Sequence, residues 1–324
     1  MTASAEAPAV PRESRRRLPD FFIVGHPKCG TTALYQMLRS HPQIYMPDAK
    51  ETRFFAPELH PGSHASRLHP ETIEQYLALF QDAEDLQRAG EASPSYLRSH
   101  TAAARIAELA PDARIIAILR EPADFLRSLH MELLRDHVEP EPDLAKAIAL
   151  EEARSSEQAR REAPGLVYSD YVHYADQLRR YRDAFGAERV LVLIYDDFRD
   201  DNEATVRRVL QFLGVDAQAS FQSSDANPSV RVRSLRMYEL ARSLYMGRGP
   251  VARVLKAAVK ALTPKRLRRD ALLTFRRNVL LTKPRPADEQ LTLQLRRRFK
   301  AEVVELSKYL DRDLVALWGY DRIG

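Results

Sequence analysis

The chain has 324 residues, of which 44% are hydrophobic and 29% charged, and its net charge is +5 at pH 7. This length and apolar content allow one full α/β core, while the single cysteine, Cys29, excludes an internal disulfide and indicates a reducing compartment. No apolar run approaches the ~20 residues of a membrane span, and the N-terminus lacks the apolar core of a signal peptide, so we expect a cytoplasmic protein.

The first expected element follows a tail. Residues 1–18 are rich in Ala, Pro, Ser and Arg without periodicity and are predicted to be disordered, which leaves 19–324 as one domain. Phe21–Val24 is a short apolar run typical of a buried parallel strand. A glycine-bounded turn, 26–30, follows, and apolar residues recur at helical spacing from Thr31 onward.

The turn is a candidate anion site. Where a strand, a glycine turn and a helix N-terminus meet, free backbone N–H groups and the helix dipole converge on one point. Lys28 adds a full charge there, although a plain turn with a solvated lysine is the alternative. Only nine of the 50 Lys and Arg residues are lysine, and a compact ammonium suits the oxygen of a leaving group. The residues expected to contact the anion are Lys28, Cys29, Gly30, Thr31, Thr32 and Ala33.

This turn resembles a loop of a known family. A Walker A motif places lysine after its second glycine, whereas Lys28 precedes Gly30. The run Pro27–Thr32, PKCGTT, instead resembles P-K-[SCT]-G-[ST]-T, the 5′-phosphosulfate loop of sulfotransferases that use 3′-phosphoadenosine 5′-phosphosulfate (PAPS). The resemblance implies a P-loop-like α/β fold and transfer of a sulfuryl group from PAPS without a metal.

The next segment supplies the candidate general base. The run Lys50–Phe55, KETRFF, resembles the K-E-x-x-F-F segment of the bacterial and Golgi-type branch, in which a glutamate acts as base. The resemblance implies that Glu51 deprotonates the acceptor with Lys50 beside it; a solvated loop pair is the alternative. A histidine base is the competing hypothesis, and the candidates are His26, His41, His130 and His137.

A further family segment departs from its pattern. Glu91–Leu97, EASPSYL, resembles [EK]-x-S-P-x-Y, but members with a glutamate base often carry a lysine directly before the serine. This chain has Ala92 there. One catalytic cation is therefore missing, and Lys50 is a candidate to replace part of its role.

The second half of the nucleotide site is expected after another strand. Arg114–Leu119 is apolar and β-branched, and Arg120-Glu121-Pro122 follows it. The family has R-[DE]-P here and a serine eight residues after the arginine, which corresponds to Ser128. The resemblance implies that Arg120 and Ser128 bind the 3′-phosphate of PAPS, and a guanidinium with a hydroxyl suits a dianion.

The later elements complete an α/β pattern. Helical spacing covers Asp170–Phe185, Asn202–Leu213 and Asp288–Leu310, and a strand is expected at Val190–Tyr195. Strands alternating with helices predict a three-layer fold with a mostly parallel sheet covered on both faces. Asp196 follows the late strand and leaves an ATP-dependent small-molecule kinase as an alternative, since such enzymes place a Mg²⁺-binding acid at a strand end.

The C-terminal third carries a basic segment. Residues 248–285 hold twelve Lys or Arg and one acid, and part of this run forms a basic amphipathic helix pattern. It predicts a solvated helix face, an anionic membrane surface or a lid over an acidic acceptor; without interleaved aromatic residues we expect no nucleic-acid binding. Just before it, Arg233 lies in a run that loosely resembles the family's cofactor-covering loop.

We therefore expect a PAPS-dependent sulfotransferase of bacterial type. The acceptor is expected to be a hydroxyl or amine of a small molecule, sugar or lipid, bound by the loops 56–75, 137–165 and 245–285. A non-catalytic protein of the same fold that binds anions or membranes is the second alternative.

Overall fold

The structure is a computed structural model that describes residues 17–59, 69–136, 138–162, 165–222, 231–232, 281–282 and 288–323. The chain divides into two compact units. The first unit comprises Met1–Arg120 and His173–Ala226, and the second comprises Glu121–Val172 and Asn227–Gly324. The prediction of one domain over 19–324 stays a prediction.

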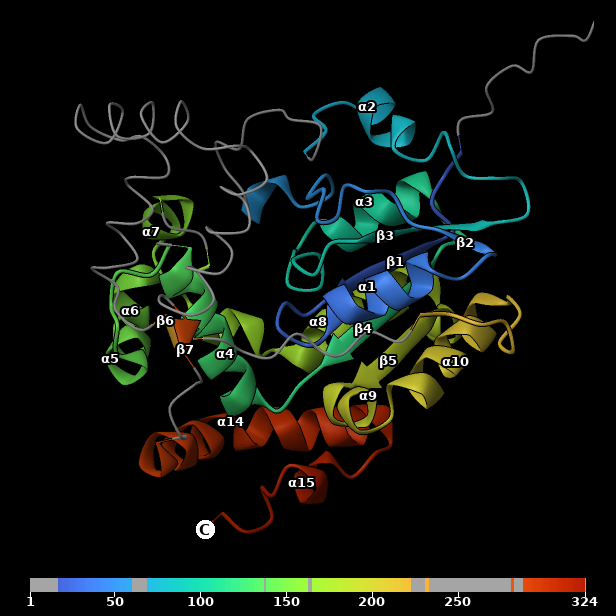
Figure 1. The fold of residues 1–324 in the computed structure, drawn as a ribbon. Coiled ribbons are helices and arrows are strands. Elements are labelled where there is room, and N and C mark those ends of the chain that lie inside the picture. Colours follow the sequence, from blue (N-terminus) through green and yellow to red (C-terminus); the bar gives the residue numbers. More distant parts are fainter. Residues whose placement is uncertain are drawn as a thin grey trace, which may run out of the picture. The chain divides into compact units, whose positions relative to one another are not determined.

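The first unit contains a five-stranded sheet of order β2-β3-β1-β4-β5, and every neighbouring pair is parallel (Figure 1). The central strand β1 is wholly buried, as expected when helices cover both faces of a sheet. In register, Phe21 of β1 lies opposite Gly90 of β3 and Arg114 of β4. The strands are β1 Phe21–Gly25, β2 Ile44–Tyr45, β3 Arg88–Ala92, β4 Arg114–Leu119 and β5 Val190–Ile194.

Helices cover both faces of this sheet. α1 packs with α10, and α3 packs with α8, which also contacts β4 and β5 (Figure 1). Right-handed crossovers place these two pairs on opposite faces, because the chain moves one way along the sheet after β1 and the other way after β3. The helices of this unit are α1 Thr31–Arg39, η1 Pro57–Leu59, α2 Ile73–Ala78, α3 Ala102–Leu109, α8 Tyr174–Phe185, η3 Ala187–Arg189, α9 Tyr195–Asp200 and α10 Asn202–Leu213.

The second unit is mainly helical in its described residues. The long helix α14 packs against α4 and α15, and a short antiparallel pair joins β6 to β7. Glu121 caps α4 by accepting from the Asp124 N–H, and its carboxylate also accepts from Tyr320 Oη at 2.8 Å. The elements are α4 Pro122–Arg135, α5 Leu144–Ala149, α6 Glu151–Arg154, α7 Glu157–Glu162, η2 Tyr168–Tyr171, β6 Arg231–Val232, β7 Leu281–Thr282, α14 Glu289–Leu310 and α15 Leu314–Leu317.

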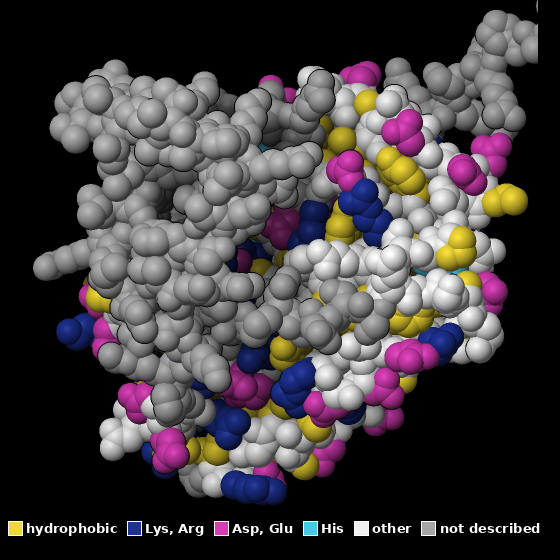
Figure 2. All heavy atoms as spheres, in the orientation of Figure 1, with side chains coloured by type: hydrophobic (Ala, Val, Ile, Leu, Met, Phe, Trp, Pro, Cys, Tyr) yellow, Lys and Arg dark blue, Asp and Glu magenta, His cyan; other side chains and the backbone are white. Residues whose placement is uncertain are grey.

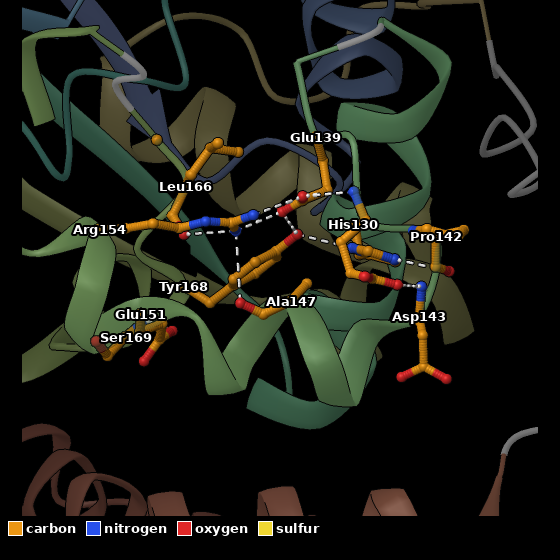
Figure 3. A network of polar contacts seen from close by, with 12 residues as sticks. His130, Glu139, Pro142, Asp143, Ala147, Glu151, Arg154, Leu166, Tyr168 and Ser169 are labelled. Atoms are coloured by element: carbon orange, nitrogen blue, oxygen red, sulfur yellow. Dashed lines mark hydrogen bonds and ion pairs between the residues drawn. The ribbon is translucent and has the colours of Figure 1, made fainter. Parts of the chain in front are cut away.

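A buried ion pair holds part of this unit together (Figure 3). The guanidinium of Arg154 donates to both carboxylate oxygens of Glu139, at 2.7 and 2.9 Å. Tyr168 Oη donates to the same carboxylate at 3.0 Å and lies 2.7 Å from His130 Nδ1. The network therefore joins α4, α6 and η2 through paired polar groups, as buried charges require.

The predicted fold class is confirmed, and most predicted elements are present. The strand Arg114–Leu119 and the helix Asn202–Leu213 have the predicted bounds. Tyr195, predicted to end a strand, instead begins α9, and the helix predicted from Asp170 begins at Tyr174 after a 3₁₀ turn.

Candidate functional site

The anion loop, residues 26–30, connects β1 to α1 at the carboxyl edge of the sheet. Gly30 precedes α1 with φ of 85°, and a Cβ at this position would lie 2.9 Å from the ring of Phe198. Only glycine meets both conditions without strain. No side chain caps α1, and the N–H groups of Thr31, Thr32 and Ala33 have no partner within the helix because they form its first turn. The strand, the turn and the uncapped helix N-terminus predicted here are therefore present, and anion binding stays a prediction.

Lys28 and Arg120 lie together at this loop. Lys28 adopts φ of 63°, a left-handed conformation that is uncommon for a side-chain-bearing residue. Arg120 follows β4, and its Nη1 donates to the carbonyl oxygen of Lys28 at 3.4 Å. The guanidinium also lies over the ring of Tyr195, 4.7 Å from its centroid. The Arg120 guanidinium thus reaches the backbone of the anion loop at Lys28, and Tyr195 orients it.

Two residues inside the loop are structural. Cys29 is fully buried, and burial raises the pKa of its thiol to about 12. The thiol therefore stays protonated and fills space in the core. His26 is also fully buried, with Nε2 at 2.7 Å from Gln177 Oε1, and burial lowers its pKa to about 3. It is a neutral core residue rather than a cation of the site.

The candidate base lies at the end of the neighbouring strand. The Glu51 N–H donates to the Ala92 carbonyl at 2.9 Å, which attaches the segment to the carboxyl end of β3, next to β1. Lys50 Nζ lies 2.5 Å from Glu51 Oε1. The Glu51 side chain is 46% exposed, against 16% for Lys50, so its carboxylate is accessible to an acceptor.

The competing histidines lie elsewhere or outside the described residues. His41 follows the far end of α1 and is 2.9 Å from the carbonyl of Asp216. His130 belongs to the buried network of the second unit (Figure 3), and His137 lies outside the described residues. His69 was not singled out in the sequence. Its pKa is lowered by burial and by the charge of Arg53, and the charge of Glu51 opposes that shift.

Two further residues were predicted to contact the cofactor. Ser128 is a buried residue of α4 in the second unit, whereas Arg120 ends the first unit. Arg233, together with most of the basic segment 248–285, lies outside the described residues. The roles of Ser128 and Arg233 stay predictions.

The kinase alternative gains no support from the described acids. Asp196, the candidate metal-binding acid at a strand end, forms an ion pair with Arg199 at 3.1 Å within α9. In the described part of the chain, no group of three or more His, Cys, Asp or Glu side chains is arranged to hold a metal ion.

None of the described helices is both long and apolar enough to cross a membrane.

A separate cavity lies at the opposite edge of the sheet. It has a volume of about 480 Å³ and is lined in part by Asp20, Arg88, Arg114 and Arg189, which belong to the amino ends of strands or precede them. Arg88 pairs with Asp20 at 3.3 Å, and Arg114 donates to the Leu213 carbonyl. The cavity therefore contains cations that already have partners, and it is not part of the candidate site.

Comparison with known proteins gives one consistent family. A sequence model of the sulfotransferase family matches residues 19–219. Mouse bifunctional heparan sulfate N-deacetylase/N-sulfotransferase 4 is 29% identical over 222 residues, which cover 61% of this chain and 22% of that protein. Mouse heparan sulfate glucosamine 3-O-sulfotransferase 3A1 is 27% identical over 209 residues, with 63% and 47% covered.

A solved structure agrees over a longer range. A sulfotransferase from Alicyclobacillus acidocaldarius superposes with a TM-score of 0.67 at 27% identity, covering 93% of this chain and 99% of that one. The chain spans less than half the length of the two mouse proteins.

Proposed function

The chain belongs to the sulfotransferase family, and on that premise we propose that it transfers a sulfuryl group from PAPS to a hydroxyl or amine of an acceptor. The observation that carries the proposal is the anion loop with Lys28 and Arg120 beside it. The heparan sulfate names of the mouse relatives favour a sugar among the acceptor classes, ahead of a lipid or another small molecule.

The loop would bind the 5′-phosphosulfate. The N–H groups of Thr31, Thr32 and Ala33 would donate to its oxygens, at the positive end of the α1 dipole. In the reaction the acceptor oxygen bonds to sulfur while the bond from sulfur to the bridging phosphate oxygen breaks. Negative charge then develops on that oxygen, where the Lys28 ammonium would stabilise it.

Glu51 would act as the general base. The acceptor hydroxyl loses its proton as it attacks, and the exposed carboxylate of Glu51 would accept it. Lys50, in contact with that carboxylate, would orient it and supply part of the charge that a lysine at Ala92 would have supplied. Arg120 would bind the 3′-phosphate, together with Ser128 and Arg233 as the family resemblance implies.

Calorimetry tests this function without knowledge of the acceptor. We expect 3′-phosphoadenosine 5′-phosphate, the nucleotide product, to bind the full chain equally well with EDTA and with Mg²⁺. Lys28→Ala and Arg120→Ala should each weaken binding at least tenfold, because each removes a charged contact to the nucleotide. Preference for ATP with Mg²⁺ would instead support a kinase. Binding without transfer from radiolabelled PAPS to any acceptor offered would support a non-catalytic anion-binding protein.

Two acceptor probes follow from the proposed sugar class. N-desulfated heparan sulfate offers free amines and hydroxyls, whereas desulfated chondroitin offers hydroxyls, and ³⁵S transfer from PAPS reports sulfation of either polysaccharide. We also propose a cytoplasmic location, on the ground of the single buried cysteine, with the basic segment 248–285 available for an anionic membrane surface.

A further inference from the structure

The segment that carries Glu51 is conformationally strained. Glu51 and Arg53 adopt φ of 63° and 62°, and Thr52 lies buried between them. Left-handed conformations of residues other than glycine are unfavourable and persist only where surrounding contacts enforce them. Two such residues on either side of one buried threonine indicate that something holds Thr52 firmly.

Thr52 is held by a buried carboxylate. Its Oγ1 donates to Glu91 Oε1 at 2.8 Å, and Glu91 is fully buried at the end of β3. Ser93 Oγ donates to the same oxygen at 2.5 Å, and Tyr76 Oη donates to Oε2 at 2.9 Å. Tyr96 Oη lies 3.1 Å from Thr52 Oγ1. We call the four hydroxyl groups of Thr52, Tyr76, Ser93 and Tyr96 the hydroxyl cage.

Three of the four protons of the hydroxyl cage point toward Glu91. Each hydroxyl has one proton, and the hydroxyls of Thr52, Ser93 and Tyr76 donate theirs to the carboxylate of Glu91. Tyr96 must then donate to Thr52, since the Thr52 proton is already used. Burial raises the pKa of Glu91, and the hydroxyl donors oppose that rise. The arrangement matches an acceptor-only carboxylate at the centre.

The hydroxyl cage also receives the backbone of the strained segment. The Arg53 N–H donates to Ser93 Oγ at 3.4 Å, and the Phe55 N–H donates to Tyr96 Oη at 3.4 Å. The ring of Phe54 stacks on Tyr76 with centroids 4.7 Å apart. Glu91 therefore fixes the segment through hydroxyl groups that bond it on one side and the segment on the other.

We infer that Glu91 is a positioning residue that holds the Lys50–Phe55 segment, and so places the carboxylate of Glu51 for proton transfer. The inference rests on the proposed function, in which Glu51 is the base. Glu91 itself is fully buried and has no route to a substrate, so it is not a catalytic residue. Its effect reaches Glu51 through Thr52, the adjacent residue.

The central variant is Glu91→Gln, which keeps the size of the side chain. An amide replaces one acceptor oxygen by a donor, so at least one hydroxyl of the cage loses its acceptor. We expect hydrogen exchange of the Glu51 and Arg53 amides to become at least tenfold faster, while exchange in α1 and the affinity for 3′-phosphoadenosine 5′-phosphate stay at wild-type values. With whichever desulfated polysaccharide the wild type sulfates, kcat should fall about tenfold to a hundredfold and KM for PAPS should stay unchanged.

Matched variants separate positioning from general destabilisation. Thr52→Val removes the hydroxyl that joins Glu91 to the segment and should reproduce the effect of Glu91→Gln, whereas Thr52→Ser retains the hydroxyl and should restore activity. Tyr76→Phe removes a donor of the cage. Tyr45→Phe removes a hydroxyl that donates only to the Leu79 carbonyl, and it should leave kcat and amide exchange unchanged.

The outcomes distinguish this inference from the proposed function. Wild-type amide exchange at Glu51 in the Glu91→Gln chain would overturn the inference, even if product nucleotide binding and Glu51→Gln behave as proposed. Loss of nucleotide binding in Glu91→Gln would also overturn it, because the residue would then act on the whole sheet edge. If Glu51→Gln retains wild-type turnover, the base assignment fails, whatever Glu91→Gln does.

Discussion

At the scale of single residues, the burial of His26 determines how the stability of the protein depends on pH. Its ring is fully buried against Gln177 and Tyr174 in the first unit, and burial lowers its pKa from 6.5 to about 3. The unfolded chain therefore binds a proton near pH 6.5 that the folded chain does not bind until near pH 3. Stability is present in full above pH 6.5 and is lost as the pH falls below it.

We predict that His26→Gln removes this loss. Between pH 7.5 and 5.0 the histidine should lower the free energy of unfolding by about 2 kcal/mol, since one pH unit corresponds to about 1.4 kcal/mol. Urea unfolding of both chains at the two pH values measures the difference. Carboxylates contribute equally to both chains, so an equal loss in wild type and variant would contradict the buried neutral state of His26.

Individual residues also show what a sequence can and cannot predict about the site. Lys28 and Arg120 were predicted because each follows an apolar strand in a recognisable motif, and the structure brings them together. Tyr195 was placed at a strand end without a role, because nothing in the sequence shows that its ring supports Arg120. Glu91 was seen only as part of a motif. Its hydroxyl partners come from separate stretches of the chain, so its burial was not predictable.

At the scale of elements, the length of the apolar run separates the strands that the sequence predicts from the strands that it misses. β4 has six residues with five buried apolar side chains in a row, and such a run predicts a parallel strand directly. β3 reads RAGEA and β2 has only two residues, so neither carries an apolar signal. β3 still forms, because Gly90 allows the Phe21 ring to lie against it.

The close approach of Gly30 in the anion loop to Phe198 in α9 predicts the effect of a substitution at Gly30. Gly30→Ala would place a methyl group 2.9 Å from the Phe198 ring at a residue with φ of 85°. The left-handed backbone alone costs an alanine about 1–2 kcal/mol, and the clash would shift the loop from α9. We expect a lower melting temperature and at least tenfold weaker binding of 3′-phosphoadenosine 5′-phosphate by calorimetry.

A second glycine provides the matched control. Gly214 ends α10 with φ of 70°, and a Cβ there would meet only Arg114 Nη1, at 3.3 Å. Gly214→Ala should therefore lower stability by a similar backbone cost while nucleotide affinity stays at the wild-type value. Equal weakening of affinity in both variants would show that the effect of Gly30→Ala is global rather than local to the anion loop.

At the scale of the whole molecule, charge is unevenly distributed along the chain. Residues 248–285 have a net charge of +11, and the remaining residues have a net charge of −6, which together give the +5 of the whole chain. On the described part of the face shown in Figure 2, Lys and Arg side chains are interspersed with Asp and Glu. At the proposed nucleotide site we therefore expect affinity to depend on the local arrangement of Lys28, Arg120 and the α1 N-terminus more than on the net charge.

This dependence predicts how the nucleotide stabilises the whole protein. A ligand that binds only the folded state adds about 2.7 kcal/mol at a hundred times its dissociation constant. Every residue that we propose to contact the nucleotide lies in the first unit, apart from Ser128 and Arg233. If the two units unfold separately, 3′-phosphoadenosine 5′-phosphate should therefore raise one melting transition more than the other, and EDTA should not change the shift.

Differential scanning calorimetry of the full chain, with and without the nucleotide, measures both transitions. The wild type should show the shift and Arg120→Ala should lose it, because the guanidinium of Arg120 lies at the anion loop. Equal shifts of both transitions would mean that nucleotide contacts extend into the second unit, as the predicted role of Ser128 requires. A shift that needs Mg²⁺ would contradict metal-free binding, and with it the mechanism assigned to Lys28.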